Sequence, residues 1–571
     1  MALMTRRDFM RAGMGATAGT LLPVVNSARD ASSPMGKVEG ARPNIIMILA
    51  DDMGFSDIGC YGSEIHTPHL DRMAAGGLRF SQFYNNPRCC PSRACLLTGL
   101  YPHQAGFGLM TAEYGESPFP AYKGDLSDRC VTIAEALRPS GYRTAMCGKW
   151  HLTPPALESQ HNWPLQRGFE KYFGTIAGAS SYFDPATLTR DNSRIRAGGD
   201  FYYTDAIAKN AVQYIDDFGR TGSPFFLYVA FTSPHWPLHA LAEDIAKYQD
   251  RYHTGWDELR AERHQRMLKM GMVEEKWGIS SRDPRVPPWD LARYKDWEAR
   301  RMAVYAAQID RMDQGIGKIL AKLQELAIEK DTLIMFMSDN GGNFEELSGT
   351  RGANVEVPIH IPHETFDGRL VRVGNDPSVM PGPDDTYQSY GIPWGNVSNT
   401  PFRLFKHYAH EGGISTPLVA YWPAMIRQGN TITQQIGHEM DIMATCIDVA
   451  GVDYPKTYLG REIIPLEGKT LLPVFQGRHR EGHEALFWEH EGNSAVRMGK
   501  WKLVSKYPDY WELHDMEADR TELHDLADQD TQRVSEMASL YGEWAKKVGA
   551  QPWPLPGVES DVPGIPKYLR R

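Results

Sequence analysis

The sequence predicts an α/β fold with a large, mostly parallel sheet flanked by helices and a smaller antiparallel-sheet subdomain at the C-terminal end. Short, continuously apolar runs, such as residues 44–50 and 332–337, are typical of strands that are buried on both faces. Between such runs lies a helical pattern at about residues 302–326, with apolar residues on one face. Strands that alternate with helices indicate a mostly parallel sheet.

Size and composition limit the class of protein. The 571 residues exceed a typical domain several-fold, and 42% hydrophobic with 23% charged residues exclude wholesale disorder. With 61 Lys+Arg against 71 Asp+Glu the net charge is −10, which argues against a nucleic-acid partner. No apolar run approaches the length of a membrane span, so we expect no stable membrane anchor.

The N-terminal residues resemble a targeting signal. Arg6 and Arg7 precede a weakly apolar stretch of small residues at 12–25, which is the pattern of a twin-arginine export signal. The alternative is an ordinary disordered basic tail. We expect residues 1–33 to be a signal and linker of the bacterial twin-arginine type, and the mature protein to be exported to the periplasm or the extracellular space.

Two further regions follow this signal in the predicted organisation. The alternating strands and helices place a large α/β domain at residues 40–451. Short strands at 485–488 and 501–504, with a helix near 535–548, predict an α+β subdomain with an antiparallel sheet at residues 452–571.

Polar residues follow four of the predicted strands, at 44–50, 142–146, 224–231 and 332–337. In order along the chain they are Asp51 and Asp52, Lys149 and His151, His235, and Asp339 and Asn340. A single Asp or Asn at a strand end is usually a cap or turn residue. Four such ends favour a functional site, because ligands of parallel sheets bind outside the carboxyl ends of the strands.

The chemistry of these side chains indicates an anion bound beside a metal. Three carboxylates and one amide are oxygen ligands, which suit Ca²⁺ or Mg²⁺ and do not suit a soft metal. Lys149, His151 and His235 add positive charge and groups that can transfer protons. The set therefore suits a reaction at a tetrahedral oxyanion.

The segment at residues 86–99 indicates more specifically to which class of protein the chain belongs. It contains, in this order, Cys89, Pro91, Ser92, Arg93, Thr98 and Gly99. For an isolated cysteine, a buried thiol, half of a disulfide or a thiolate activated by Arg88 and Arg93 would each be reasonable. The whole pattern instead resembles type I sulfatases, in which this cysteine is oxidised to Cα-formylglycine. Cys90 departs from the family pattern, because a small residue is usual there.

The resemblance covers most of the chain after the signal, in particular to bacterial arylsulfatases, and its motifs continue to Lys406 and Glu411. It implies the fold of the alkaline-phosphatase superfamily. It also implies a metal site, with Ca²⁺ favoured over Mg²⁺, held by Asp51, Asp52, Cys89, Asp339 and Asn340. The catalytic residues that it implies are Cys89, Arg93, Lys149, His151, His235 and Lys406.

The activity implied by this resemblance is hydrolysis of a sulfate ester to an alcohol and inorganic sulfate through a formylglycine–sulfate intermediate. The substrate would be a small-molecule or carbohydrate sulfate ester, and a formylglycine-generating enzyme would be a partner during maturation. Two alternatives remain open. One is a phosphonate monoester or phosphodiester hydrolase of the same superfamily; the other is a non-catalytic, calcium-stabilised binder of sulfated glycans.

Overall fold

The structure is a computed structural model that describes residues 42–111, 117–154, 159–348 and 361–556. A ten-stranded sheet forms its centre, with the order β13-β2-β12-β9-β1-β8-β4-β5-β6-β7. The predicted export signal at residues 1–33 lies outside the described residues. Among the helices that are described, none combines the length and the apolar character that crossing a bilayer requires.

The strands predicted from apolar runs form the middle of this sheet. They are β1 (Asn44–Ala50), β4 (Arg143–Gly148), β8 (Phe225–Ala230) and β9 (Thr332–Ser338). They lie side by side in the order β9-β1-β8-β4 and run parallel, as does β5 (Lys171–Thr175) next to β4. The prediction of a large, mostly parallel sheet is therefore confirmed.

Short strands extend the sheet at both edges. They are β2 (Leu78–Phe80), β6 (Leu188–Arg190), β7 (Ser193–Arg194), β12 (Leu418–Tyr421) and β13 (Thr431–Thr433). β12 runs antiparallel to both β9 and β2, and β6 runs antiparallel to β5. The sheet is therefore mixed, with its parallel part in the centre, where four strands end at one common edge.

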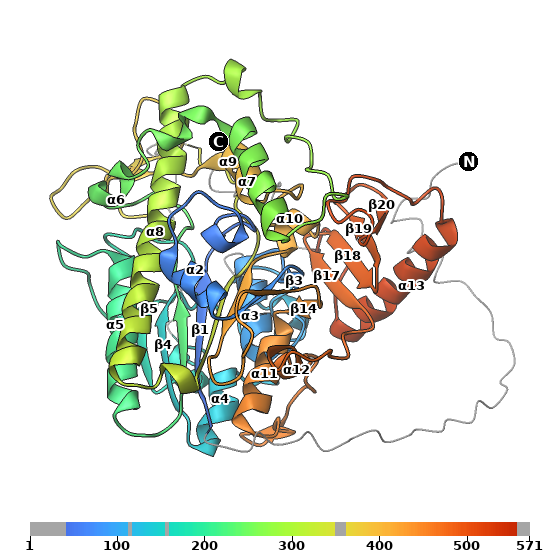
Figure 1. Cartoon of the computed structure of the whole chain (residues 1–571). Helices are drawn as coiled ribbons and strands as arrows, with labels where there is room; N and C mark the ends of the chain where they lie inside the picture. Colours follow the sequence, from blue (N-terminus) through green and yellow to red (C-terminus); the bar gives the residue numbers. More distant parts are fainter. Residues whose placement is uncertain (1–41, 112–116, 155–158, 349–360, 557–571) are drawn as a thin grey trace, which may run out of the picture.

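Helices cover both faces of the sheet (Figure 1). One face packs against α2 (Pro68–Ala75), α5 (Tyr203–Gly219) and α8 (Lys295–Glu325), and the other against α3 (Cys89–Thr98), α4 (Ile133–Leu137) and α11 (Met440–Ala450). Side chains of β1 alternate between these two cores: Ile46 and Ile48 face α8, and Ile45 and Met47 face α3. Helix α8 begins earlier than its apolar pattern predicts, because buried Trp297 extends the packed face by more than a turn.

Other short elements lie outside the central layers. The helices are α6 (Ala242–Ala246), α7 (Trp256–Met270), α9 (Gly391–Ser398), α10 (Glu411–Ile414) and α12 (Leu472–Phe475). The two-stranded pairs are β3 (Phe83–Tyr84) with β14 (Gly437–His438), β10 (Arg372–Val373) with β11 (Thr386–Tyr387), and β15 (Thr457–Tyr458) with β16 (Arg461–Glu462).

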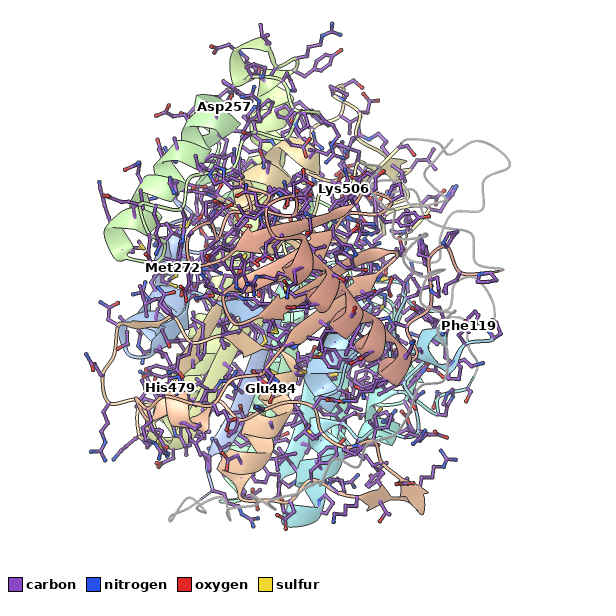
Figure 2. All side chains as sticks on the ribbon, turned by 90° about the vertical axis from the view of Figure 1, so that its right-hand side faces the viewer. Phe119, Asp257, Met272, His479, Glu484 and Lys506 are labelled. Atoms are coloured by element: carbon purple, nitrogen blue, oxygen red, sulfur yellow. The ribbon has the colours of Figure 1, made fainter. Side chains whose placement is uncertain are left out.

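A second sheet of four antiparallel strands lies beside the main domain, as the sequence predicts. It comprises β17 (Leu486–His490), β18 (Asn493–Met498), β19 (Trp501–Ser505) and β20 (Trp511–Asp515), and α13 (Thr531–Val548) packs on it. Figure 2 views the molecule from this side, with Lys506 in the loop after β19 near the upper edge of the sheet. The turn between β17 and β18 is Glu491-Gly492, and both residues have positive φ, as in a tight hairpin turn.

A buried ionic cluster joins the two sheets. On β19, the Lys502 ammonium lies 2.8 Å from Glu411 of α10 and 2.7 Å from Glu522, and none of the three side chains is exposed. Glu411 also accepts a hydrogen bond of 3.0 Å from the Tyr84 hydroxyl of β3. The buried Arg520 lies 3.5 Å from Glu411, so Lys502 and Arg520 together offset the two carboxylates at the junction.

Substituting Lys502→Met should destabilise this junction strongly. It leaves Glu411 and Glu522 buried with one cation, Arg520, near Glu411 in place of two. Removing one partner of a buried ion pair costs about 3–5 kcal/mol. The free energy of unfolding, measured by urea denaturation, should fall by this amount.

The matched control is Lys500→Met. Lys500, in the turn just before the same strand, pairs with Asp515 at 2.6 Å, and 42% of its side chain is exposed. Exposed pairs contribute at most about 1 kcal/mol. Equal losses in the two variants would contradict the role assigned to Lys502.

Candidate active site

The parallel strands deliver their polar residues to a single edge. Asp51 and Asp52 follow β1, Lys149 and His151 follow β4, His235 follows β8, and Asp339 and Asn340 follow β9. Each of these seven residues is at least 95% buried. The structure therefore brings together every strand-end residue that the sequence singles out.

Two of these strand-end residues have a strained backbone conformation. Asp52 has φ of 63° and His151 has φ of 59°, values that are uncommon for residues other than glycine. In this conformation the amide of Asp52 donates a hydrogen bond of 3.1 Å to Asp339 Oδ1, which ties the end of β1 to the end of β9. Such local strain is characteristic of functional sites.

Helix α3 brings the nucleophile candidate and an arginine to the same edge. Cys89 is the first residue of α3, and its Sγ lies 4.0 Å from Asp52 Oδ1. Arg93 follows one helical turn later on the same face. Its Nε and Nη2 donate to Asp339 Oδ2 at 3.1 and 2.9 Å, and its Nη1 donates to the Lys149 carbonyl at 2.9 Å.

Two lysines from different parts of the chain face the two adjacent aspartates. Lys149 Nζ donates to Asp51 Oδ2 at 2.6 Å, and Lys406 Nζ donates to Asp52 Oδ2 at 2.7 Å. Burial by itself lowers the pKa of each lysine, but Asp51 and Asp52 outweigh it and raise the pKa of Lys149 and of Lys406, respectively. Burial likewise raises the pKa of Asp52, yet Lys406 and His235 together lower it below its usual value. Asp52, Lys149 and Lys406 are therefore charged.

The two histidines and the cysteine are uncharged in this environment. Burial lowers the pKa of His235 to about 3, against the opposing effect of Asp52. Burial and the neighbouring Lys149 lower the pKa of His151 well below its usual value. Burial raises the pKa of Cys89 to about 11.

The donor set fits a divalent cation. Asp51, Asp52, Cys89 and His235 each offer one ligand atom, and these atoms all lie within 4.8 Å of one another. Asp51 Oδ1 and Asn340 Oδ1 are buried and accept no hydrogen bond within the described part of the chain. Buried oxygens without a partner are costly, and a cation between them removes that cost.

Asp339 is placed differently from the other predicted metal ligands. Its Oδ2 accepts two hydrogen bonds from Arg93 and its Oδ1 accepts one from the Asp52 amide, and it is not a member of the four-residue group. Of the predicted ligands, Asp51, Asp52 and Cys89 belong to the four-residue group, together with His235, which was not predicted as a ligand. Asn340 lies beside the group, because its Nδ2 donates to Asp52 Oδ1 at 2.8 Å, while Asp339 faces Arg93.

Sequence reasoning missed a second layer of buried polar residues. Asn343 Nδ2 donates to Asp52 Oδ2 at 2.8 Å and to Glu345 Oε2 at 3.0 Å. Glu345 also accepts hydrogen bonds from Arg88 at 3.0 Å and from the Trp236 indole at 2.6 Å. Burial raises the pKa of Glu345, but Lys406 and Arg88 outweigh it and hold the pKa below its usual value. Extending the search for polar residues a few positions beyond β9 would have found Asn343 and Glu345.

A strand-edge cluster of this kind, on a mostly parallel sheet, agrees with the alkaline-phosphatase-like superfamily of hydrolases, to which the match to a family model assigns the chain. Comparison with family models gives the narrower identification. The Sulfatase family matches residues 43–452, and the C-terminal region of N-sulphoglucosamine sulphohydrolase matches residues 402–543. The chain belongs to the sulfatase family and is a sulfuric ester hydrolase.

Individual relatives agree with this assignment. An uncharacterized sulfatase of Schizosaccharomyces pombe is 30% identical over 546 residues, which cover 90% of this chain and 95% of the relative. An arylsulfatase of Klebsiella aerogenes is 33% identical over 463 residues, covering 77% of this chain and 93% of the relative.

Two solved structures share the fold. The crystal structure of Ps i-CgsB has a TM-score of 0.64 and 24% identity, covering 90% of this chain and 95% of that one. A protein solved in complex with its substrate D-glucosamine-2-N,6-O-disulfate has a TM-score of 0.55 and 19% identity, covering 89% of this chain and 98% of that one.

Removing divalent cations should destabilise the folded protein. A ligand that binds only the folded state adds about 2.7 kcal/mol at a concentration 100 times its Kd. We therefore expect the melting temperature to fall on treatment with EDTA and to recover when Ca²⁺ is added. An unchanged melting temperature would contradict the metal site.

Two neighbouring asparagines give a matched pair for this measurement. Asn340→Ala removes an oxygen that accepts no hydrogen bond, whereas Asn343→Ala removes one that already accepts a bond of 2.6 Å from the Glu345 amide. The Ca²⁺-dependent rise in melting temperature should shrink in Asn340→Ala and persist in Asn343→Ala.

Proposed function

We propose that the protein hydrolyses its sulfate ester through a Cα-formylglycine formed from Cys89, with Ca²⁺ as the bound cation. The observation that carries this proposal is the position of Cys89. It is the first residue of α3, beside Asp52 and one turn before Arg93, and it contributes to the cluster of candidate metal ligands. A nucleophile at this point lies beside both the cation and the positive side chains.

The charges of the site support an anionic substrate. Three carboxylates face three cationic side chains, so their formal charges cancel when all six are ionised: these are Asp51, Asp52, Asp339, Arg93, Lys149 and Lys406. Burial, together with Asp51, raises the pKa of Asp339 to about 7, and a proton on Asp339 would only make the site more positive. Arg88 and Glu345 form a further pair with no net charge. A divalent cation would then give the site a net positive charge, which attracts the negatively charged sulfate group.

A formylglycine at position 89 would supply a hydrated aldehyde, whose second hydroxyl lets the bound sulfate leave by elimination. The remaining roles follow from contacts of the chain itself. Lys149 and Lys406, which flank the two aspartates, would bind the non-bridging sulfate oxygens. Arg93 holds Asp339 and the Lys149 backbone in place. The site is buried, so these interactions act with little screening by water.

Two neutral histidines are placed to move protons. His235 donates from Nδ1 to the Trp236 carbonyl at 2.6 Å, which leaves Nε2 facing Lys406 Nζ at 3.4 Å. This pair would hold a proton at the leaving oxygen of the ester. His151 Nδ1 makes no hydrogen bond to the described residues and would accept a proton from the nucleophile.

The substrate class and the biogenesis belong to the same proposal. The glucosamine disulfate bound by a protein of the same fold supports a carbohydrate sulfate ester, and the arylsulfatase relative supports a small aryl ester. A formylglycine-generating enzyme would be needed for maturation, and residues 1–33 would direct export. Residues 40–451 would form the catalytic domain and residues 452–571 the C-terminal subdomain.

Mass spectrometry of the peptide that contains Cys89 tests the modification. In protein made in a host with a formylglycine-generating enzyme, we expect an aldehyde in place of the thiol. An unmodified thiol in fully active protein would refute the proposed nucleophile.

Two cysteine variants test the same assignment by activity. Cys89→Ala should abolish hydrolysis of an aryl sulfate, with the loss limited only by the detection of the assay. The adjacent and equally buried Cys90→Ala should keep both the aldehyde and most of the activity, because Cys90 packs in the apolar core. Unchanged hydrolysis in Cys89→Ala would exclude the mechanism.

Matched aryl sulfate and aryl phosphonate esters test the chemical class of the substrate. We expect a higher kcat/KM for the sulfate. A preference for the phosphonate would favour a phosphonate monoester or phosphodiester hydrolase, and binding of sulfated glycans without turnover of any ester would favour a non-catalytic binder.

A further inference from the structure

A second group of potential metal ligands lies outside the site described above. It consists of His407, which follows Lys406 in the chain, His490 at the end of β17, and Glu491 in the turn after it. One ligand atom from each lies within 4.8 Å of the others. His490 is fully buried, His407 is 5% exposed, and the Glu491 side chain is 10% exposed. Two distant parts of the chain therefore meet here away from solvent.

The spacing of these atoms suits a shared ion. His407 Nδ1 lies 3.6 Å from Glu491 Oε2, and His490 Nε2 lies 4.0 Å from Glu491 Oε1. Both distances exceed those of a hydrogen bond. They are close to the separation of about 3.4 Å between two ligands that each lie about 2.1 Å from a tetrahedral Zn²⁺.

The His490 imidazole is held as a metal-binding histidine is. Its Nδ1 lies 3.4 Å from the Gly108 carbonyl, which favours a proton on Nδ1 and a lone pair on Nε2. The Nε2 of His490, which faces Glu491, is buried and lacks a hydrogen-bond partner among the described residues. The His407 backbone is fixed by a hydrogen bond of 2.6 Å from its amide to the Pro87 carbonyl, and its Nδ1 is the atom that faces Glu491. An oriented imidazole nitrogen of His490 and the Nδ1 of His407 thus converge on one carboxylate.

The surrounding charges permit a cation. Arg88 and Lys406 are positive groups close to His407. Arg88 pairs with Glu345 at 3.0 Å and Lys406 pairs with Asp52 at 2.7 Å, which offsets both charges. Burial, with a contribution from Arg88, lowers the pKa of His407 to about 3, so this imidazole is neutral. Neutral imidazoles and a carboxylate favour Zn²⁺ and related ions over Ca²⁺, which prefers a shell of oxygens.

We propose that His407, His490 and Glu491 form a second metal site, specific for Zn²⁺ or a similar first-row divalent ion. Three protein ligands leave one position of a tetrahedral ion for water. The ion links the segment that carries Lys406 to the β17–β18 turn, and so connects the active site to the C-terminal sheet. This proposal does not depend on the modification of Cys89.

Co²⁺ is the probe for this site, because its visible absorption reports the coordination number. The test uses the full chain with Cys89→Ala, so that no thiolate of the first site binds cobalt, and with Ca²⁺ in excess to fill the oxygen-rich site. We expect one equivalent of Co²⁺ with the intense bands of four- or five-coordinate geometry, displaced by one equivalent of Zn²⁺. Absence of such binding would overturn the proposal.

Ligand variants locate the ion. In the same background, His490→Gln, His407→Gln and Glu491→Gln should each weaken Co²⁺ binding by more than about tenfold, since loss of a supporting residue alone costs 10–100-fold. The control is His438→Gln, another fully buried histidine, which should leave the binding unchanged. Equal Co²⁺ affinity in all four variants would contradict the proposal, because the ion would then bind at another place in the protein.

A further measurement uses no ligand variants, so misfolding of such a variant cannot affect its result. Zn²⁺ added to the Ca²⁺-saturated Cys89→Ala protein should raise its melting temperature further, because the ion crosslinks two segments of the folded state. No additional rise would count against the site.

Discussion

The electrostatic balance at the edge of the central sheet is the constraint on which the site depends. Asp51, Asp52 and Asp339 are fully or almost fully buried within a few ångströms of one another. Burying carboxylates without compensation costs several kcal/mol each. The chain offsets this cost with cations from three separate segments: Arg93 on α3, Lys149 after β4 and Lys406 after α9. The helices, strands and loops that carry these residues are therefore held to one relative placement.

Local sequence patterns are enough to predict much of this arrangement. The four central strands are continuous apolar runs, and a run buried on both faces points to the middle of a parallel sheet. Once the strands are parallel, their carboxyl ends share an edge, so the proximity of Asp51 and Asp339 follows without a structure. The position of Arg93 also follows, because four residues make about one turn of the helix that begins at Cys89.

What could not be predicted depends on long-range packing. Strands β2 and β12 are three and four residues long, too short to show the alternation of apolar and polar side chains that identifies a strand. The antiparallel pairing of β12 with β9 depends on contacts formed within the folded sheet. The position of Glu345 soon after β9 is a local sign, but its partners Arg88, Trp236 and Lys406 are distant in sequence and could not be predicted. The contact of His407 with the β17–β18 turn likewise depends on how the C-terminal sheet docks, which no local pattern encodes.

The burial of Cys89 limits when its side chain can be reached by another enzyme. Its side chain is only 1% exposed, at the start of a helix whose ten residues are all buried. An oxidising enzyme would need to surround that thiol, and in the folded state doing so would require removing α3 from the core. The proposed modification of Cys89 would therefore have to take place while the chain is still unfolded. A molecule that folded before modification would then keep its thiol and remain inactive.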